Sequence, residues 1–405
     1  RSDVIGRVTD DGIARIFEGD VLAGHVPVGL LTDPPLYRLD GVKPSGLDQL
    51  QSQDLNAFPL PSSGPASVLI TLLVSPNIAG KEWVYRQYDH QVQTNTVIPP
   101  GGDAALLRVK GTQRGLALTT DGNGRICFLD PYTGGQIAVA ESCRNLATVG
   151  AEPIALTDCL NFGNPENPEI YYQLENCIRG MADASKAFGA PVISGNVSLY
   201  NESRGTGIYP TPVIGALGLA DDVTKTARIG FAIDGDVVVL LGRDSLEAPA
   251  AELAGSEYLE LIHDTVAGIP EIDMELEIAV QRACRRLIHD RIARSAHDCS
   301  DGGLLVALAE SCVAGAIGLT LIADLPDRWD AALFGEGQSR IVVSVDRSAL
   351  DRLDEICRDE GVPWTELGTV GGDTLNAPWL DETPVVQLRD AWANGLERAL
   401  KPETE

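Results

Sequence analysis

From about residue 66 onwards, short apolar runs alternate with longer segments of helical periodicity, and this alternation most limits what the chain can fold into. Alternating strands and helices are typical of α/β domains in which helices pack against a sheet. We therefore expect an α/β fold with mixed sheets flanked by helices. The expected strands are 104–109, 115–119, 153–158, 190–196, 213–219, 237–242, 319–323 and 340–345, and the expected helices include 131–150, 171–188, 274–293 and 302–315.

Changes in composition divide the chain into five segments. Residues 1–40 combine short strand-like runs with turn signals, as expected for the last strands of a preceding domain. Residues 41–65 are rich in Pro, Ser, Gly, Gln and Asp, which indicates a linker or an extended crossing segment. Two α/β domains are expected next, at 66–224 and 225–390. A tail with one short helix and a charged end is expected at 391–405.

The start of the chain is unusual for a natural N-terminus. It begins at Arg1 without a methionine and enters at once a strand-like run, so we expect a piece of a longer protein. The 405 residues, 44% of them hydrophobic, can form two or three cores. No apolar run reaches the roughly 20 residues that span a bilayer, and no signal peptide is visible. We expect a cytoplasmic protein without membrane contact.

The charge of the chain limits its partners. There are 31 basic and 58 acidic side chains, which gives a net charge of −27. A surface this acidic repels nucleic acids and anionic membranes. If the ligand is an anionic nucleotide, a divalent cation is the simplest way to hold its phosphates.

The eight cysteines form no CxxC pair and have no zinc-ligand spacing. Several of them, such as Cys312, lie in apolar or helical settings. We therefore expect buried free thiols in a reducing compartment, in preference to disulfides or a zinc site.

Two strand ends carry the polar groups that best fit a ligand site. Asp158 ends one expected strand and precedes the Asn-Phe-Gly-Asn-Pro loop 161–165. Ligands of α/β domains sit at such strand ends, although an Asp there can equally bond to its own loop. On the next strand, Gly195 leaves the backbone open to a nucleotide, and Asn196 offers a neutral oxygen to Mg²⁺. Ser198 can face the same side as Asn196, but the alternative of a tight turn with a satisfied Asn stays open.

For the other polar motifs, a structural role is at least as good an interpretation as a functional one. His90 lies in a polar stretch and can be an acid or base, but a single His is more often a hydrogen-bonded structural residue. The run 120–125 is a turn signal. Ser300 or Asp301 can cap the helix that follows them, with or without an anion. No Walker A motif is present, and no GxGxxG motif lies in a βαβ context.

Taken together and in this order, the polar phrases resemble one family. The phrases 75–79, 88–91, 156–165 and 194–202 are similar to the second half of the phosphoribosylformylglycinamidine synthase large-subunit family. The phrases 295–303 and 334–340 resemble the C-terminal domain of the wider aminoimidazole ribonucleotide synthetase superfamily. The match covers essentially the whole chain. It implies that 66–224 is the ATP-binding N-terminal-type domain and that 225–390 is the C-terminal-type domain.

The resemblance implies an ATP-dependent ligase of purine biosynthesis. Such an enzyme converts formylglycinamide ribonucleotide and glutamine-derived ammonia to the amidine, with release of ADP and phosphate. The implied cofactors are ATP and Mg²⁺, and the implied partners are a glutaminase subunit, a small bridging subunit and the missing N-terminal half. Alternatives are another ATP-dependent member, such as aminoimidazole ribonucleotide synthetase or selenophosphate synthetase, or a non-catalytic nucleotide-holding scaffold.

The resemblance also assigns roles to individual residues. It implies that Asp158 and Gly195 contact ATP, that Asn196 binds magnesium, and that Ser198 contacts the ribonucleotide. No catalytic residue is implied in this chain, because the family's catalytic histidines lie in the first half; His90 and His297 do not take those roles. Gly337 departs from the more usual Ser of the 334–340 loop.

Overall fold

The computed structural model describes residues 2–34, 36 and 38–401, and the chain divides into two units, Arg1–Asp40 and Gly41–Glu405. The first unit is a hairpin followed by a short helix. Strands β1 (Ile13–Glu18) and β2 (Val21–Pro27) pair antiparallel around a turn at Gly19, whose φ of 62° is left-handed, and α1 covers Val28–Thr32.

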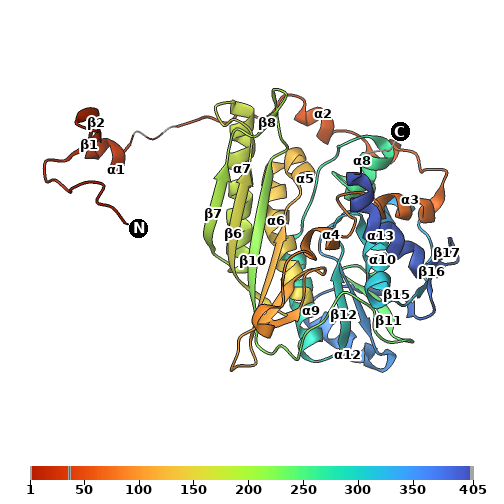
Figure 1. The fold of residues 1–405 in the computed structure, drawn as a ribbon. Helices are drawn as coiled ribbons and strands as arrows, with labels where there is room; N and C mark the ends of the chain where they lie inside the picture. The colour runs from red at the N-terminus through yellow and green to blue at the C-terminus, as the bar shows by residue number, and fades with distance from the viewer. Residues whose placement is uncertain (1, 35, 37, 402–405) are drawn as a thin grey trace. The chain divides into compact units, whose positions relative to one another are not determined.

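The second unit contains a six-stranded sheet in the order β3-β4-β5-β10-β6-β7 (Figure 1). Only β6 and β7 are parallel; all other neighbours are antiparallel. The sheet is therefore mixed, as predicted from the sequence. Its strands are β3 (Thr96–Ile98), β4 (Ala105–Arg108), β5 (Gly115–Asp121), β6 (Glu152–Asn161), β7 (Val192–Ser198) and β10 (Thr211–Ala220), and the small hairpin β8 (Glu202–Ser203) and β9 (Thr206–Gly207) follows β7.

Helices α5 (Gly124–Leu129), α6 (Pro131–Thr148) and α7 (Pro168–Phe188) pack with the buried side chains of this sheet. Helices α6 and α7 approach very closely. A Cβ atom on Gly180 would lie 1.9 Å from the carbonyl oxygen of Tyr132, and one on Gly135 would lie 2.3 Å from that of Cys177. Glycine is needed at both positions because any side chain would force the helices apart.

A second sheet has seven strands in the order β12-β14-β11-β15-β13-β16-β17. Both of its faces are covered. In β11 (Val237–Leu241), Val237, Val239 and Leu241 belong to one buried cluster, and Val238 and Leu240 belong to another. This explains why β11 is a continuous apolar run. The other strands are β12 (Ala293–Asp298), β13 (Leu319–Leu321), β14 (Ile341–Val345), β15 (Trp364–Val370), β16 (Thr374–Ala377) and β17 (Leu380–Pro384).

The two clusters pack different helices against the second sheet. One contains side chains of α9 (Met274–His289) and α12 (Leu350–Glu360). The other contains side chains of α8 (Glu257–His263), α10 (Gly303–Gly315), α11 (Trp329–Phe334) and α13 (Val385–Leu400). The α/β fold class predicted from the sequence is confirmed. We retain the division into 66–224 and 225–390 as a proposal, with two corrections.

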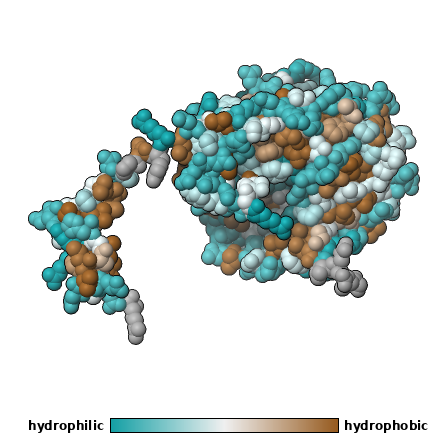
Figure 2. All heavy atoms as spheres, turned by 90° about the horizontal axis from the view of Figure 1, so that it is seen from above, coloured by the Kyte–Doolittle hydropathy of each residue, from teal (hydrophilic) through white to brown (hydrophobic). Residues whose placement is uncertain are grey.

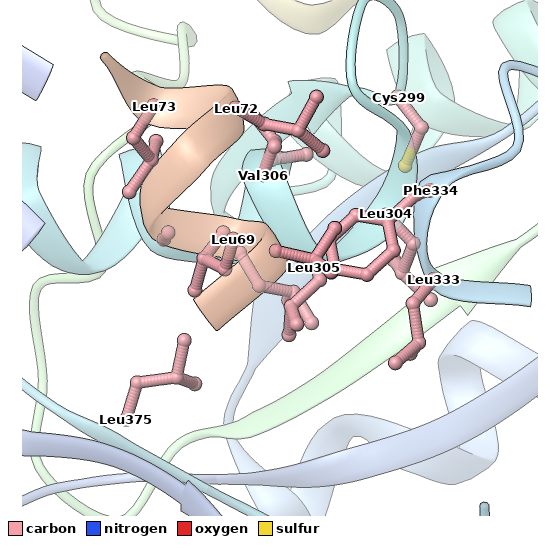
Figure 3. Close-up of a cluster of buried hydrophobic side chains, with 14 of the residues drawn as sticks. Leu69, Leu72, Leu73, Cys299, Leu304, Leu305, Val306, Leu333, Phe334 and Leu375 are labelled. Atoms are coloured by element: carbon pink, nitrogen blue, oxygen red, sulfur yellow. The ribbon is translucent and has the colours of Figure 1, made fainter. Parts of the chain in front are cut away.

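The first correction concerns the start of the N-terminal-type domain. Helix α3 (Gly64–Leu73) was assigned to that domain, but Leu69, Leu72 and Leu73 pack with Leu304 and Leu305 of α10 in the core of the second sheet (Figure 3). The segment before α3 also crosses this part of the molecule. It contains α2 (Leu47–Gln51), and Arg328 donates to the carbonyl of Asn56 at 2.9 Å. A short helix, α4 (Glu82–Tyr85), follows α3.

The second correction concerns the C-terminal segment. The expected tail 391–405 begins inside α13, which continues to Leu400; residues 402–405 lie outside the described residues. Leu388 and Ala391 are buried, and Trp392 Nε1 donates to Glu310 at 2.9 Å. The apolar face of this helix therefore completes a core and is not a free tail.

Hydrophilic and hydrophobic side chains are interspersed over the face of Gly41–Glu405 seen in Figure 2. Within the described residues, no helix is long and apolar enough to cross a membrane.

The packing of α3 makes a stability prediction. Leu72 is fully buried, so Leu72→Ala should lower the free energy of unfolding by about 2 to 5 kcal/mol. Thr71→Ala, on the exposed side of the same helix, should change it by less than about 0.5 kcal/mol. Urea unfolding of the two variants measures both values. Equal effects of the two substitutions would contradict the packing of α3 in this core.

Candidate functional site

The four residues singled out by the sequence lie near the carboxyl ends of β6 and β7. The two strands are parallel, and Asp158 pairs with Gly195, Cys159 with Asn196 and Asn161 with Ser198. Strand β7 is the edge of the sheet (Figure 1). One edge of β7 therefore has no neighbouring strand in this sheet.

The carboxylate of Asp158 lies directly over the bare Cα of Gly195. A Cβ atom on Gly195 would be 2.2 Å from Asp158 Oδ1, so no other residue fits at position 195 without moving the carboxylate. Burial raises the pKa of Asp158 above its usual value. The pair therefore places a carboxylate beside backbone that carries no side chain.

Asn196 lies on the opposite face of the sheet from Asp158. Its Nδ2 is 3.7 Å from Sγ of Cys159, its partner in register, and consecutive side chains of a strand point to opposite faces. Asp158 and Asn196 therefore lie at the same end of the two strands but on opposite faces of the sheet, so their side chains cannot share one metal ion. Sequence spacing placed both residues at strand ends but could not fix the register between the strands.

Ser198 lies two residues after Asn196 on the same extended strand and so faces the same side. Its Oγ is 3.1 Å from Nδ2 of Asn201. Asn196 and Ser198 thus form one pair on one face of β7, and Asp158 and Gly195 form a second pair on the other. A ligand that contacts all four must extend across the edge strand.

A second group of polar residues lies between the two sheets and was missed by sequence reasoning. Its centre is Arg144 of α6, which is fully buried. The guanidinium donates to Glu277 Oε1 at 2.9 Å and to Asp298 Oδ2 at 3.4 Å, and it also contacts Gln338 Oε1 at 3.3 Å. One side chain therefore joins the first sheet's helix to α9, to β12 and to the 334–340 loop.

His297 lies beside this cluster between two carboxylates. Its Nδ1 is 2.7 Å from Asp103 and its Nε2 is 3.0 Å from Glu310. Burial alone would lower the pKa of His297, but the Asp103 and Glu310 carboxylates outweigh it and raise the pKa well above 6.5. The oxygen and nitrogen atoms of Asp103, His297 and Asp298 are close enough for a metal. The bonds to both ring nitrogens instead favour an imidazolium, which cannot be a metal ligand.

Several carboxylates of this region hold protons more tightly than usual. Burial and the carboxylate of Asp301 raise the pKa of Asp121 to about 6, and burial and Asp103 raise that of Asp298 to about 7. Burial and Asp121 raise the pKa of Glu141 well above 4.5. A cavity of about 370 Å³ opens here, lined in part by Asp103, Asn145, His297, Asp298, Ser300 and Glu310. The phrases 295–303 and 334–340 supply Asp298 and Gln338, but nothing in the sequence indicated that they meet at Arg144.

The remaining motifs have structural roles. His90 Nδ1 lies 3.3 Å from the carbonyl oxygen of Tyr88, and Asn123 of the turn 120–125 caps α5. The expected capping of α10 by Ser300 or Asp301 is wrong. The amide of Gly302 at the start of α10 donates instead to Glu336 Oε1 at 2.8 Å, because the 334–340 loop brings a carboxylate to that helix end.

Two family models match the chain. The N-terminal domain of AIR synthase related proteins matches residues 101–220, and the C-terminal domain of the same proteins matches residues 234–379. The chain belongs to the AIR synthase related proteins. The first matched region contains β4 to β10 of the chain and the second contains β11 to β16, so each match covers most of one sheet.

Curated relatives carry one name. The chain is 50% identical over 376 residues to "Phosphoribosylformylglycinamidine synthase subunit PurL" of Moorella thermoacetica, covering 92% of this chain and 50% of the relative. It is 49% identical over 402 residues to the protein of the same name from Thermomicrobium roseum, covering 97% and 54%. The chain spans about half the length of the curated relatives it matches.

Solved structures of proteins named PurL are also similar to this chain. "T. maritima PurL complexed with AMPPCP" is 26% identical with a TM-score of 0.56, over 89% of this chain and 50% of that chain. "T. maritima PurL complexed with FGAR" is 25% identical with a TM-score of 0.57, over 90% and 48%. The relatives named PurL thus include structures with a nucleotide analogue and with FGAR.

The raised pKa of Asp121 predicts how stability depends on pH. Because its folded pKa of about 6 exceeds the ordinary 3.8, the stabilisation it gives is complete below about pH 4 and is lost as the pH rises through 6. Asn at this position stays neutral at every pH, and its one oxygen can accept either from Asn145, which donates to Asp121 at 2.9 Å, or from the amide of Gly122, which donates at 2.6 Å. Asp121→Asn should therefore gain stability relative to the parent chain between pH 4 and 7.

Urea unfolding at several pH values measures this difference. Asp222→Asn is the control of opposite sign, since hydrogen bonds from Thr224 lower the pKa of Asp222. That carboxylate stabilises the fold at higher pH and loses its contribution as the pH falls, so the control should lose stability relative to the parent above about pH 4. A pH-independent difference for Asp121→Asn would contradict the raised pKa.

Proposed function

We propose that this chain forms part of a phosphoribosylformylglycinamidine synthase, the ATP-dependent ligase that makes formylglycinamidine ribonucleotide in purine biosynthesis. The curated relatives carry that name, and solved PurL structures are described as complexes with AMPPCP, ADP and FGAR. The observation that carries the proposal for this chain is the arrangement of Asp158 over Gly195 on one side of edge strand β7 and of Asn196 and Ser198 on the other.

ATP would lie across the edge of β7. Asp158 can accept hydrogen bonds from the nucleotide, and Gly195 lets a nucleotide approach the backbone. The Nδ2 of Asn196 faces Cys159, which leaves Asn196 Oδ1 for a cation on the phosphates. Ser198, on the same face as Asn196, would contact the ribonucleotide. The reacting groups then meet beside the Asn196–Ser198 pair.

The residues of this chain bind and orient the reactants. In the reaction, the carbonyl oxygen of the glycinamide amide attacks the γ-phosphorus and ADP leaves; ammonia then adds to the activated carbon and displaces phosphate, and the formyl group is unchanged. Mg²⁺, when bound, neutralises phosphate charge. Asn196 fits it as one neutral oxygen ligand, but Mg²⁺ prefers octahedral oxygen coordination, so the phosphates and further carboxylates must supply the rest. We assign no catalytic acid or base to this chain.

The buried cluster between the sheets supports a second ligand site. Polar side chains of Asp103, Asn145, Asp298 and Ser300 line the cavity beside this cluster. The adjoining cavity of about 370 Å³ has the volume of a small-molecule site. A cation bound there together with an anionic ligand would reduce the repulsion between the buried carboxylates.

The remaining parts of the proposal follow from the family. We infer that the other half of the synthase supplies the rest of the ATP site, and that a glutaminase subunit and a small bridging subunit deliver ammonia in the cytoplasm. Two alternatives are disfavoured. Aminoimidazole ribonucleotide synthetase is disfavoured by the name that the curated relatives share. A non-catalytic scaffold would not need the polar Asn196–Ser198 pair next to Asp158 and Gly195.

Complementation tests the proposal directly. This chain should give no formylglycinamide-ribonucleotide-dependent ADP release by itself, because Asp158 is assigned to ATP and the other three candidate residues cannot act as an acid or base for the amine step. With the remaining half of a PurL relative and ammonium as the nitrogen source, activity should appear. Robust activity of the chain alone would overturn the divided site, and inactivity of the complemented mixture would overturn the proposed function.

A substitution tests the metal ligand. Asn196→Leu keeps the side-chain volume but removes the oxygen, so ADP release by the complemented enzyme should fall at least about a hundredfold. Asn196 is exposed, so the thermal unfolding temperature should change little. Asn394→Leu on α13 is the control and should retain activity. Parental turnover by folded Asn196→Leu would reject the ligand role.

A further inference from the structure

Beyond the four candidate residues, the turn after β7 contains a side chain that holds one of them in place. Asn201 lies three residues after Ser198, and its Nδ2 donates to the carbonyl of Ser198 at 2.8 Å and to the carbonyl of Phe162 at 3.1 Å. The backbone amide of Asn201 also donates to the carbonyl of Phe162, at 3.1 Å. One residue therefore ties the end of β7 to the loop that follows β6.

These contacts fix the orientation of the amide. A primary amide has two N–H hydrogens, and two carbonyl acceptors use both. The reverse orientation would place Asn201 Oδ1 against two carbonyl oxygens, which repel it. The Ser198 Oγ lies 3.1 Å from Nδ2 and 3.3 Å from Oδ1 of this amide, and because the two N–H groups are used by the carbonyls, the hydroxyl can donate to Oδ1. The Ser198 side chain is thus held by a group that is itself fixed.

The backbone between the two residues supports the same conclusion. Tyr200 has a φ of 62°, a left-handed conformation that is unfavourable for a residue with a side chain. Its amide donates to Gly163 at 3.1 Å, and the amide of Phe162 donates to Ser198 at 3.0 Å. Strain of this kind persists where the surroundings fix the backbone and is concentrated at functional sites.

We propose that Asn201 is a positioning residue that sets the place and hydrogen-bonding direction of Ser198 toward the ribonucleotide substrate. This inference rests on the proposed function, because Ser198 is assigned to the substrate there. Asn201 itself lies behind Ser198 and makes its contacts to Ser198 and to the backbone of Phe162. Its effect should reach the ribonucleotide and leave ATP binding at Asp158 and Gly195 unchanged.

The test compares Michaelis constants in the enzyme complemented with the other half of a PurL relative. Asn201→Ala should raise KM for formylglycinamide ribonucleotide about tenfold, the loss expected for one well-placed hydrogen bond, and change KM for ATP less than about twofold. Ser198→Ala should give a similar rise. The double substitution should add little to Ser198→Ala alone, because Asn201 acts through Ser198.

Two further variants serve as a matched control and as a replacement for Asn201→Ala. Asn176→Ala is the matched control: its Nδ2 donates to a carbonyl of its own helix at 2.8 Å, and both KM values should stay unchanged. Asn201→Asp keeps the size but cannot donate to the two carbonyls, and it replaces the Ala variant if that variant fails to fold.

Three results would overturn the positioning role. These are an unchanged KM for the ribonucleotide, an equal rise in both KM values, and additive effects of Ser198→Ala and Asn201→Ala. Absence of ribonucleotide-dependent ADP release in the unsubstituted complemented enzyme would instead overturn the proposed function, so the two failures are distinguishable.

Discussion

The buried guanidinium of Arg144 is the interaction on which the arrangement of the two sheets depends. It is fully enclosed, and its partners Glu277 and Asp298 come from the second sheet's side of the molecule. Removing one member of a buried ion pair leaves an uncompensated charge in a medium of low dielectric, which is strongly unfavourable. Helix α6 is therefore held against α9 and β12. This explains why Gly41–Glu405 forms one compact unit although each sheet has its own core.

The same burial gives the surrounding acids their chemistry. Only part of the negative charge around Arg144 is balanced by this guanidinium and by His297, and the remaining carboxylates respond by holding protons. The raised pKa values are therefore a consequence of burial and of repulsion between neighbouring carboxylates, which Arg144 offsets in part.

The sequence predicted the parts of the fold that depend on local patterns. Apolar alternation identified β5, β6, β7, β10 and β11, and helical periodicity identified α6 and α7. The sequence did not predict features that depend on packing between distant parts of the chain. Helix α3 is apolar on several sides, and only the tertiary structure shows that it completes the second core. The acids around Arg144 come from separate elements, such as Asp121 and Asp298, so no window of sequence contains their cluster.

Register limited the prediction of the candidate site in the same way. Asp158 and Asn196 both end strands, and this much is visible in the sequence. Which face each side chain takes depends on the pairing of Asp158 with Gly195 and of Cys159 with Asn196, and a shift of one residue would exchange the faces. Asn201 escaped notice for a related reason, since its role depends on Phe162, 39 residues away in sequence.

The position of the candidate site at an edge strand explains why it is chemically incomplete. A nucleotide triphosphate carries several negative charges, whereas Asp158 adds another and Gly195, Asn196 and Ser198 supply none that is positive. The chain as a whole has a net charge of −27. Phosphate binding at this edge is therefore unfavourable until cations and basic groups arrive from outside these four residues. Edge strand β7 leaves one side open to them, with Val192, Ile193 and Val197 exposed. The same exposure that makes β7 a poor site by itself makes it a suitable wall of a shared one.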